Sequence, residues 1–197
     1  MNDKLINRDI DEDGTVDACD LDSDNDGVLD SEEDTNANSE FLDDEGDSLP
    51  LGDGVSNTFD LDSDNDTVLD LMEGRPLSQA EINVLDSDHN GVFDEMLSYG
   101  LNGFLDLLET TPDSGVLRPE LLALRNTDGD DRPDMLDTLS DGNTFDMYLV
   151  GNDGLDIDGG GFLSVINDPD RDGVQIQVDH DPAKRGSPAS PYSPHSS

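Results

Sequence analysis

Hydrophobic residues follow two different patterns along this chain of 197 residues. In residues 9–33, 49–73 and 126–181 they occur in short runs between acidic residues, and in the first two segments the acidic loops follow one another at a stride of thirteen residues, which leaves no room for a long helix. Between residues 75 and 125 they are more frequent, and their spacing is helical in places. The pattern divides the chain into 1–74, 75–125, 126–181 and a Pro- and Ser-rich tail, 182–197, whose composition is typical of a flexible segment.

The central segment predicts short helices. Ser78 and Glu81 form a capping box before an apolar run, which predicts a helix start. A second amphipathic helix is expected from the spacing of Met96, Leu97, Leu101, Phe104, Leu105 and Leu108, although Gly100 and Gly103 disfavour it. A further short helix is expected over Leu117, Leu121, Leu122 and Leu124, with Pro119 in its first turn.

Two interpretations of the central apolar residues are open. They pack together as a small hydrophobic core, or they form a groove that binds a partner protein. Substitution of Phe104, Leu105 and Leu108 separates the two, because a core role predicts general loss of the fold. Farther along, Val174, Ile176 and Val178 alternate with glutamines, which predicts a short strand.

A repeated acidic motif fills the other segments. Residues 21–26 and 61–66 both read Leu-Asp-Ser-Asp-Asn-Asp, and residues 9–33 align with 49–73 at a shift of forty. Oxygen-bearing side chains recur at loop positions 1, 3, 5, 9 and 12, and glycine is favoured at position 6. The matching residues are Asp9, Asp11, Asp13, Asp17 and Asp20; Asp22, Asp24, Asp26, Asp30 and Glu33; Asp62, Asp64, Asp66, Asp70 and Glu73; and Asn126, Asp128, Asp130, Asp134 and Asp137.

Other loops match in part. Thr67 and Asp131 replace the glycine in two of the loops above, Leu97 stands at position 12 of a fifth loop, and Ile176 stands at position 9 of a sixth. The matching residues of those two loops are Asp86, Asp88, Asn90 and Asp94, and Asp168, Asp170, Asp172 and Asp179. Half-loops follow the same spacing at Asp53, Asn57 and Asp60; Asn102, Asp106 and Glu109; Asp141, Asn143 and Asp146; and Asp153, Asp156 and Asp158.

The spacing suits calcium, which takes six to eight oxygen ligands at about 2.3–2.6 Å. Alternating carboxylates point inward from a curled loop, the residue at position 6 turns sharply, and the acid at position 12 closes the cage. We therefore expect several Ca²⁺ ions, six or more, held by the matching residues of the six loops and by Asp53, Asn57 and Asp60. The other half-loops could supply ligands to an ion that a neighbouring loop mainly holds. Solvated acidic loops without metal are the plain alternative, which the number of copies disfavours.

Charge and composition support a role for metal. The chain has 50 acidic and 9 basic residues, a net charge of −41, 32% hydrophobic residues and no tryptophan. Such a composition is typical of disorder unless something else compacts the chain. A cation that binds only the folded state supplies that stabilisation. The single cysteine, Cys19, excludes an intrachain disulfide.

The run from Asp9 to Asp30, with its thirteen-residue stride and Cys19 at position 11, resembles the thrombospondin type 3 repeat. The resemblance covers about half the chain and implies a mostly irregular fold wrapped around a line of calcium ions, with a few short helices and little strand. It implies metal roles for the matching carboxylates. Residues 80–97 are more loosely similar to a helix followed by an EF-hand loop, with Phe93 at the hydrophobic position.

These observations predict a calcium-binding structural module of an extracellular or cell-surface protein: a rigid spacer, adhesin stalk or filament subunit. The alternatives are a calcium-dependent docking module that uses the central apolar segment, and a calcium buffer. No arrangement typical of an enzyme is found, and the charge disfavours nucleic acid. Calcium, self-assembly or another surface protein are the expected partners, without membrane insertion; no signal peptide is present in this sequence.

Overall fold

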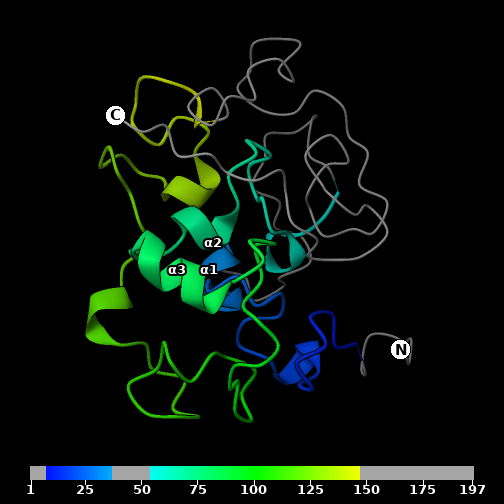
Figure 1. Cartoon of the computed structure of the whole chain (residues 1–197). Helices are drawn as coiled ribbons and strands as arrows, with labels where there is room; N and C mark the ends of the chain where they lie inside the picture. Colours follow the sequence, from blue (N-terminus) through cyan, green and yellow to red (C-terminus); the bar gives the residue numbers. More distant parts are fainter. Residues whose placement is uncertain (1–7, 37–53, 147–197) are drawn as a thin grey trace.

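In the computed structural model, residues 8–36 and 54–146 are described, and they form a mostly irregular chain with a few short helices (Figure 1). The α-helices are α1 (Asp30–Glu33), α2 (Asp70–Glu73) and α3 (Gln79–Leu85). The 3-10 helices are η1 (Asp17–Cys19), η3 (Asn57–Phe59), η4 (Pro119–Leu121) and η5 (Asp134–Leu136). Within these ranges there is no strand, only an isolated antiparallel bridge between Glu109 and Leu117. The prediction of an irregular fold with short helices is confirmed for this part.

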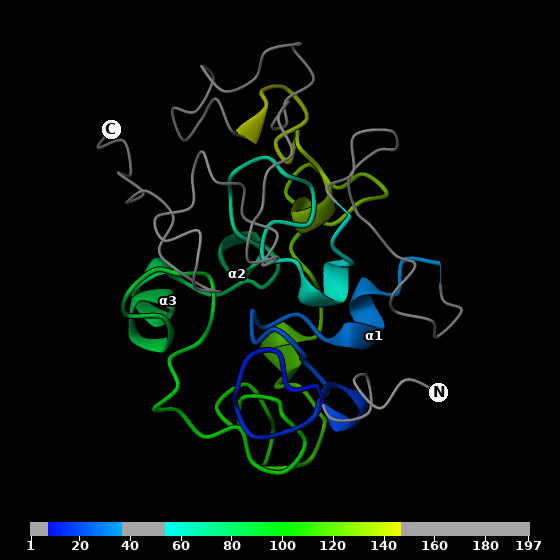
Figure 2. The same ribbon diagram turned by 90° about the vertical axis from the view of Figure 1, so that its right-hand side faces the viewer.

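The short helices α1 and α2 belong to the two acidic loops 22–33 and 62–73. Each begins at position 9 of its loop and ends at position 12. Helix α2 contacts both α3 and η5, and α1 contacts η3. Figure 2 shows loop 9–20 and residues 126–146 at opposite ends of the described part, with α1 and α2 between them. Loops 9–20, 22–33, 62–73 and 126–137 are therefore arranged along one direction of the described part, whereas loop 86–97 follows α3 to one side.

Helix α3 begins where the capping box predicts. The Ser78 side chain accepts a hydrogen bond from the Glu81 backbone N–H at 3.3 Å, and the Glu81 carboxylate accepts one from the Ser78 backbone N–H at 2.9 Å. Ile82 and Leu85 lie on the buried face, whereas Val84 is exposed. The helix ends at Leu85, and the acidic loop 86–97 starts at the next residue.

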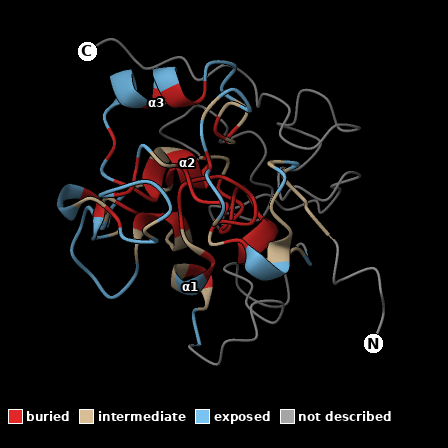
Figure 3. Cartoon of the chain, turned by 90° about the horizontal axis from the view of Figure 1, so that it is seen from below, coloured by how far each residue is buried: buried red, intermediate tan, exposed pale blue. Residues whose placement is uncertain are grey.

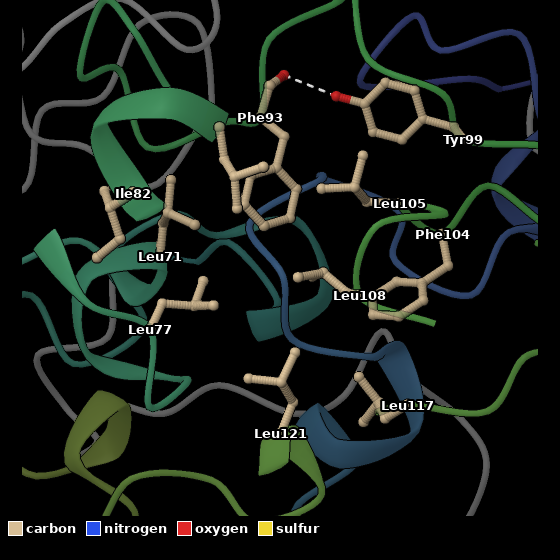
Figure 4. Close-up of a cluster of buried hydrophobic side chains, with 11 residues drawn as sticks. Leu71, Leu77, Ile82, Phe93, Tyr99, Phe104, Leu105, Leu108, Leu117 and Leu121 are labelled. Carbon is tan, nitrogen blue, oxygen red and sulfur yellow. Dashed lines mark hydrogen bonds between the residues drawn. The ribbon is translucent and has the colours of Figure 1, made fainter. Parts of the chain in front are cut away.

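A hydrophobic cluster packs beside the acidic loops (Figure 4). Its members come mainly from residues 71–121, and Figure 4 shows them converging on Phe93 and Leu108 from several segments. The Tyr99 hydroxyl donates to the Phe93 carbonyl at 2.8 Å, so the polar end of this ring is satisfied inside the cluster. The buried members are Leu71, Leu77, Ile82, Leu85, Phe93, Tyr99, Phe104, Leu105, Leu108, Leu117 and Leu121.

The predicted helix over residues 96–108 is wrong. This segment consists of turns and bends, in which Gly100 and Gly103 adopt positive φ angles of 67° and 76° that a right-handed helix cannot contain. The Asp106 N–H donates instead to the Ser98 carbonyl at 2.8 Å, which closes a loop. In the next segment, η4 (Pro119–Leu121) is the expected short helix, shortened to one 3-10 turn.

The irregular segment still delivers apolar side chains to the cluster. Phe104, Leu105 and Leu108 are fully buried, as a core role requires, whereas Met96 and Leu101 are 97% and 85% exposed. The spacing of these residues therefore distinguished an apolar segment from its surroundings but gave the wrong backbone conformation.

Two arginines connect the cluster to the loops, and the sequence pattern did not point to either. Arg75 is buried, donates from Nε to the Gly27 carbonyl at 2.9 Å and from Nη1 to the Leu121 carbonyl at 3.0 Å, and forms an ion pair with Glu32. Arg125 donates to the carbonyls of Met72, Arg75 and Leu77 at 2.8–3.1 Å. Both side chains thus satisfy backbone carbonyls of loops and of the ends of short helices.

Several predictions of the sequence lie outside the described residues. They are the strand at 174–178, the tail at 182–197, the half-loop at 153–158, the sixth loop with Asp168, Asp170, Asp172 and Asp179, and Asp53. Among the described helices, none is long and apolar enough to cross a bilayer.

We predict that Leu108→Ala lowers the free energy of unfolding by about 2–5 kcal/mol, since it removes a fully buried side chain and leaves a cavity. Leu101→Ala is the matched control, because Leu101 is exposed and its loss should change stability by less than about 0.5 kcal/mol. Chemical denaturation at fixed calcium concentration measures both. Equal effects of the two substitutions would contradict the core assignment.

Candidate metal centres

The aspartate at position 9 closes each of five acidic loops in the same way. Its backbone N–H donates to the carbonyl of the residue before position 1, and its carboxylate accepts from the N–H at position 2. The N–H bonds join Asp17 to Arg8, Asp30 to Leu21, Asp70 to Leu61, Asp94 to Leu85, and Asp134 to Arg125, at 2.7–3.0 Å. The carboxylates accept from Ile10, Ser23, Ser63, Ser87 and Thr127 at 2.7–3.2 Å.

We call this arrangement the position-9 clamp. At Asp30 the second oxygen also accepts from the Ser23 hydroxyl, at 2.9 Å, and at Asp134 it accepts from the Thr127 hydroxyl, at 2.6 Å. The second oxygen of Asp17 pairs with Arg8. The spacing predicted metal ligation for these three residues, and the contacts that the structure shows for them are those of a loop clamp.

The carboxylates at positions 1, 3 and 5 converge. The Asp22 carboxylate accepts from the Gly27 N–H at 3.1 Å, and the Asp62 carboxylate accepts from the Thr67 N–H at 3.0 Å, so both loops curl around position 1. Oxygen atoms within each group lie within 4.8 Å of one another. Three groups hold positions 1, 3 and 5: Asp9, Asp11 and Asp13; Asp22, Asp24 and Asp26; and Asp62, Asp64 and Asp66. A fourth holds positions 1, 3 and 9 of loop 86–97: Asp86, Asp88 and Asp94.

The groups of loops 22–33 and 62–73 are buried, and Figure 3 shows α2 and the coil beside it as buried. Glu33 and Glu73, at position 12 of the two loops, are buried with them. Several of their carboxylate oxygens have no hydrogen-bond donor: Asp22 Oδ1, Asp26 Oδ2, both oxygens of Glu33, Asp64 Oδ2, Asp66 Oδ2, Asp70 Oδ2 and Glu73 Oε1. A buried carboxylate without a partner is costly, and a coordinated cation removes that cost. This donor set of oxygens fits a metal ion.

The pKa values reflect the same burial. Burial raises the pKa of Asp26 to about 7 and that of Asp30 to about 6. The pKa of Glu33 is raised well above its ordinary value by burial first and then by the neighbouring charges of Asp24 and Asp26. A bound divalent cation reverses this effect, because it stabilises the ionised form of each carboxylate.

The other loops are more open. In loop 9–20 the aspartates at positions 1, 3 and 5 are half-buried, and Asp11 accepts a hydrogen bond from the Asn25 side chain of the next loop. In loop 126–137, Asn126, Asp128 and Asp130 are exposed, and the Asn126 amide donates to the Asp130 carbonyl at 2.9 Å. The carboxylates of loops 22–33 and 62–73 are thus the most deeply buried, and these two loops are the best candidates for metal sites.

Two half-loops have specific contacts. In the half-loop at 102–109, the Asn102 amide donates to Glu109 Oε1 at 2.9 Å, so an amide occupies the place that a cation would take between positions 5 and 12. Near η3, the Asn57 amide lies 3.5 Å from the Glu33 carbonyl, and the Asp60 carboxylate accepts from the Asp62 N–H at 3.0 Å. These contacts brace the neighbouring loop.

Position 6 distinguishes the two buried loops. Gly27 has a φ angle of 94°, and Thr67 has a φ angle of 78° at the same position. A β-branched residue is strained there, at a cost of roughly 1–2 kcal/mol. We predict that Thr67→Gly raises the free energy of unfolding by about 1 kcal/mol, and that Gly27→Thr lowers it by more, since a Cβ at Gly27 would lie 2.8 Å from the Phe93 ring. Thermal unfolding in calcium checks the opposite signs, and equal signs would contradict the strain at position 6.

The pKa values also predict how the metal-free protein depends on pH. Burial raises the pKa of Asp30, Asp26 and Asp11 from the ordinary value of 3.8 to about 6, 7 and 8. Below about pH 4 these carboxylates are protonated in both the folded and the unfolded chain, so their burial costs no charge. As pH rises through the raised pKa values, the folded chain loses the stability that protonation gave it. In EDTA the melting temperature should therefore fall between pH 4 and pH 8. In saturating calcium it should rise over the same range, because protons compete with the ions. A metal-free protein that becomes more stable with rising pH would contradict this.

None of the protein-family models, curated proteins or solved structures compared with this chain matches it. The buried carboxylates and acidic groups described above are thus the findings that bear on its function: they are capable of holding metal ions.

Proposed function

We propose that this chain is a calcium-binding structural module, in which bound ions take the place of a large hydrophobic core. The observation that carries the proposal is the burial of carboxylates without hydrogen-bond donors in loops 22–33 and 62–73. In water these groups are fully solvated, so a fold that buries them needs a compensating positive charge. A divalent ion in each loop supplies it.

The chemistry of the donors favours calcium over other metals. The acidic groups named above contain only carboxylates, whereas zinc sites use histidine and cysteine. Irregular loops with many carboxylate and carbonyl oxygens suit the flexible coordination of calcium, while magnesium requires a strict octahedron and retains several waters. The alternation at positions 1, 3 and 5 with an acid at position 12 supports the same choice.

The net charge of −41 explains how calcium would act on the whole chain. Without cations, acidic loops that lie side by side repel one another and expand the chain. Each ion that binds only the folded state contributes about 2.7 kcal/mol at a concentration 100 times its Kd. Several sites together would match the stability of an ordinary domain, about 5–15 kcal/mol.

The proposed setting is extracellular or at a cell surface, as a spacer, stalk or filament subunit. Calcium there is abundant enough to fill weak sites with a Kd of about 10⁻⁴–10⁻³ M. The order of loops 9–20, 22–33, 62–73 and 126–137 along one direction of the described part, together with the resemblance of residues 9–33 to thrombospondin type 3 repeats, supports an elongated structural role over a single binding pocket.

We predict that the effect of Glu73→Gln changes sign with calcium. In EDTA the neutral amide removes a buried charge, so the melting temperature should rise or stay constant. In calcium it removes a ligand, and stabilisation by calcium should fall by about 1–3 kcal/mol. Glu95→Gln is the matched control, because Glu95 is exposed.

Circular dichroism and small-angle X-ray scattering of the unmodified chain give the general test. Addition of millimolar calcium to the EDTA-treated protein should reduce its radius of gyration and raise its melting temperature. Unchanged scattering and melting in the two buffers would overturn the proposed function. The same titration with magnesium shows whether the sites select calcium.

A further inference from the structure

One acidic group contains residues of both buried loops. Oxygen atoms of Asp26, Glu33 and Asp70 lie within 4.8 Å of one another. Asp26 and Glu33 occupy positions 5 and 12 of loop 22–33, whereas Asp70 occupies position 9 of loop 62–73. The group therefore lies where the end of α1 meets the start of α2. A twelve-residue loop that bound its ion alone would not need the third carboxylate.

The side chains of this group are buried and lack donors. Glu33, Asp26 and Asp70 have exposed fractions of 0%, 1% and 1%. Both oxygens of Glu33, Oδ2 of Asp26 and Oδ2 of Asp70 have no hydrogen-bond partner. Three carboxylates thus meet in the interior with four oxygen atoms available to a ligand, which is the chemistry of a hard divalent cation.

Asp70 differs from its counterpart Asp30 in a way that favours a ligand role. Both use one oxygen for the position-9 clamp. The second oxygen of Asp30 accepts from the Ser23 hydroxyl at 2.9 Å. The Ser63 hydroxyl makes no hydrogen bond of normal geometry to Asp70 Oδ2, although it lies near enough to lower the pKa of that carboxyl. Asp70 can therefore close its own loop and bind an ion of the neighbouring loop at the same time.

The nearby positive charge does not satisfy the group. Arg75 lowers the pKa of Asp26, but its guanidinium is directed to Glu32 and to the carbonyls of Gly27 and Leu121. Glu33 and Asp70 have no ion pair with it. Among the described residues, no cationic side chain therefore forms an ion pair with Glu33 or Asp70.

We propose that a divalent cation, calcium by its donor chemistry, binds between the two loops at Asp26, Glu33 and Asp70, so that loop 62–73 completes the site of loop 22–33. This inference rests on the proposed function and adds to it a mechanism of coupling. An ion held by both loops makes calcium binding to one depend on the folding of the other, which is a coupling free energy between sites.

The same positions approach one another elsewhere in the chain. The charges of Asp13, at position 5 of loop 9–20, and Asp30, at position 9 of the next loop, act on Asp20 at position 12. Glu73, at position 12 of loop 62–73, is acted on by Asp66 and by Asp146. The Asp146 carboxylate accepts from the Ser140 N–H at 2.8 Å, and the Asp146 N–H donates to the Thr138 carbonyl at 3.0 Å, so Asp146 closes a loop one residue shorter than the position-9 clamp. In both cases the closing acid of one loop feels the charge of an aspartate that closes another loop.

A double-mutant experiment tests the shared ion. Asp70→Asn keeps an oxygen that can accept from the Ser63 N–H, so the clamp remains while the charge is removed. Glu33→Gln removes the other loop's ligand without breaking a hydrogen bond, since the Glu33 oxygens have none. Native mass spectrometry of the full chain counts calcium ions at a concentration that just saturates the unsubstituted protein, and calorimetry follows the affinity.

Each single variant should lose one ion, and the double variant should lose that same single ion. Loss of two ions in the double variant, or no loss in Asp70→Asn, would overturn the shared site while leaving calcium binding by the chain intact. Failure of the unsubstituted chain to bind calcium would overturn the proposed function instead. The two failures are therefore distinguishable.

Asp134→Asn serves as the matched control, because Asp134 makes the same clamp in loop 126–137. The losses of bound calcium caused by Asp134→Asn and by Glu33→Gln should add in the variant that carries both. Non-additive losses in this control pair would count against a specific ion shared by Asp70 and Glu33. If Asp70→Asn does not fold in calcium, Asp70→Glu replaces it in the same cycle. The longer side chain keeps the charge but moves the carboxylate, so the same loss of one ion is expected.

Discussion

The fold depends on the compensation of buried negative charge. Carboxylates from loops 22–33 and 62–73 occupy the interior where an ordinary domain of this size places aliphatic side chains. Their charge cannot stay uncompensated, so the folded state requires protons or cations. The raised pKa of Asp26 and the Glu33 oxygens without hydrogen-bond donors both result from this burial of carboxylates.

The hydrophobic cluster and the acidic loops stabilise each other. Phe93 belongs to the cluster, yet it is also position 8 of loop 86–97, and its N–H donates to the Asn25 carbonyl of loop 22–33 at 2.9 Å. Arg75 joins the Gly27 carbonyl to that of Leu121 across the same boundary. Because these contacts tie the loops to the cluster, compaction by cations would order the cluster, and packing of the cluster would hold the loops in place to bind.

Local hydrogen bonds explain why each acidic loop has a definite shape. The position-9 clamp and the turn at position 6 are made by residues within one loop, so they depend on spacing alone. This is why the sequence motif identified the loops and the convergence of positions 1, 3 and 5. The start of α3 was predictable for the same reason, because its capping box is also a local contact. Loop 86–97 keeps the clamp at Asp94 even though Leu97 replaces the closing acid.

The sequence by itself determined the loop spacing, the excess of negative charge, the irregular fold with short helices, and the apolar character of residues 96–121. It misassigned residues 96–108 as a helix, because helical spacing of apolar residues does not reveal that Gly100 and Gly103 turn the backbone. Only the tertiary structure decided which carboxylates are buried, that Arg75 lies in the interior, and that Asp70 meets Glu33. Those outcomes depend on contacts between residues about forty positions apart, and no local pattern encodes how distant loops pack together.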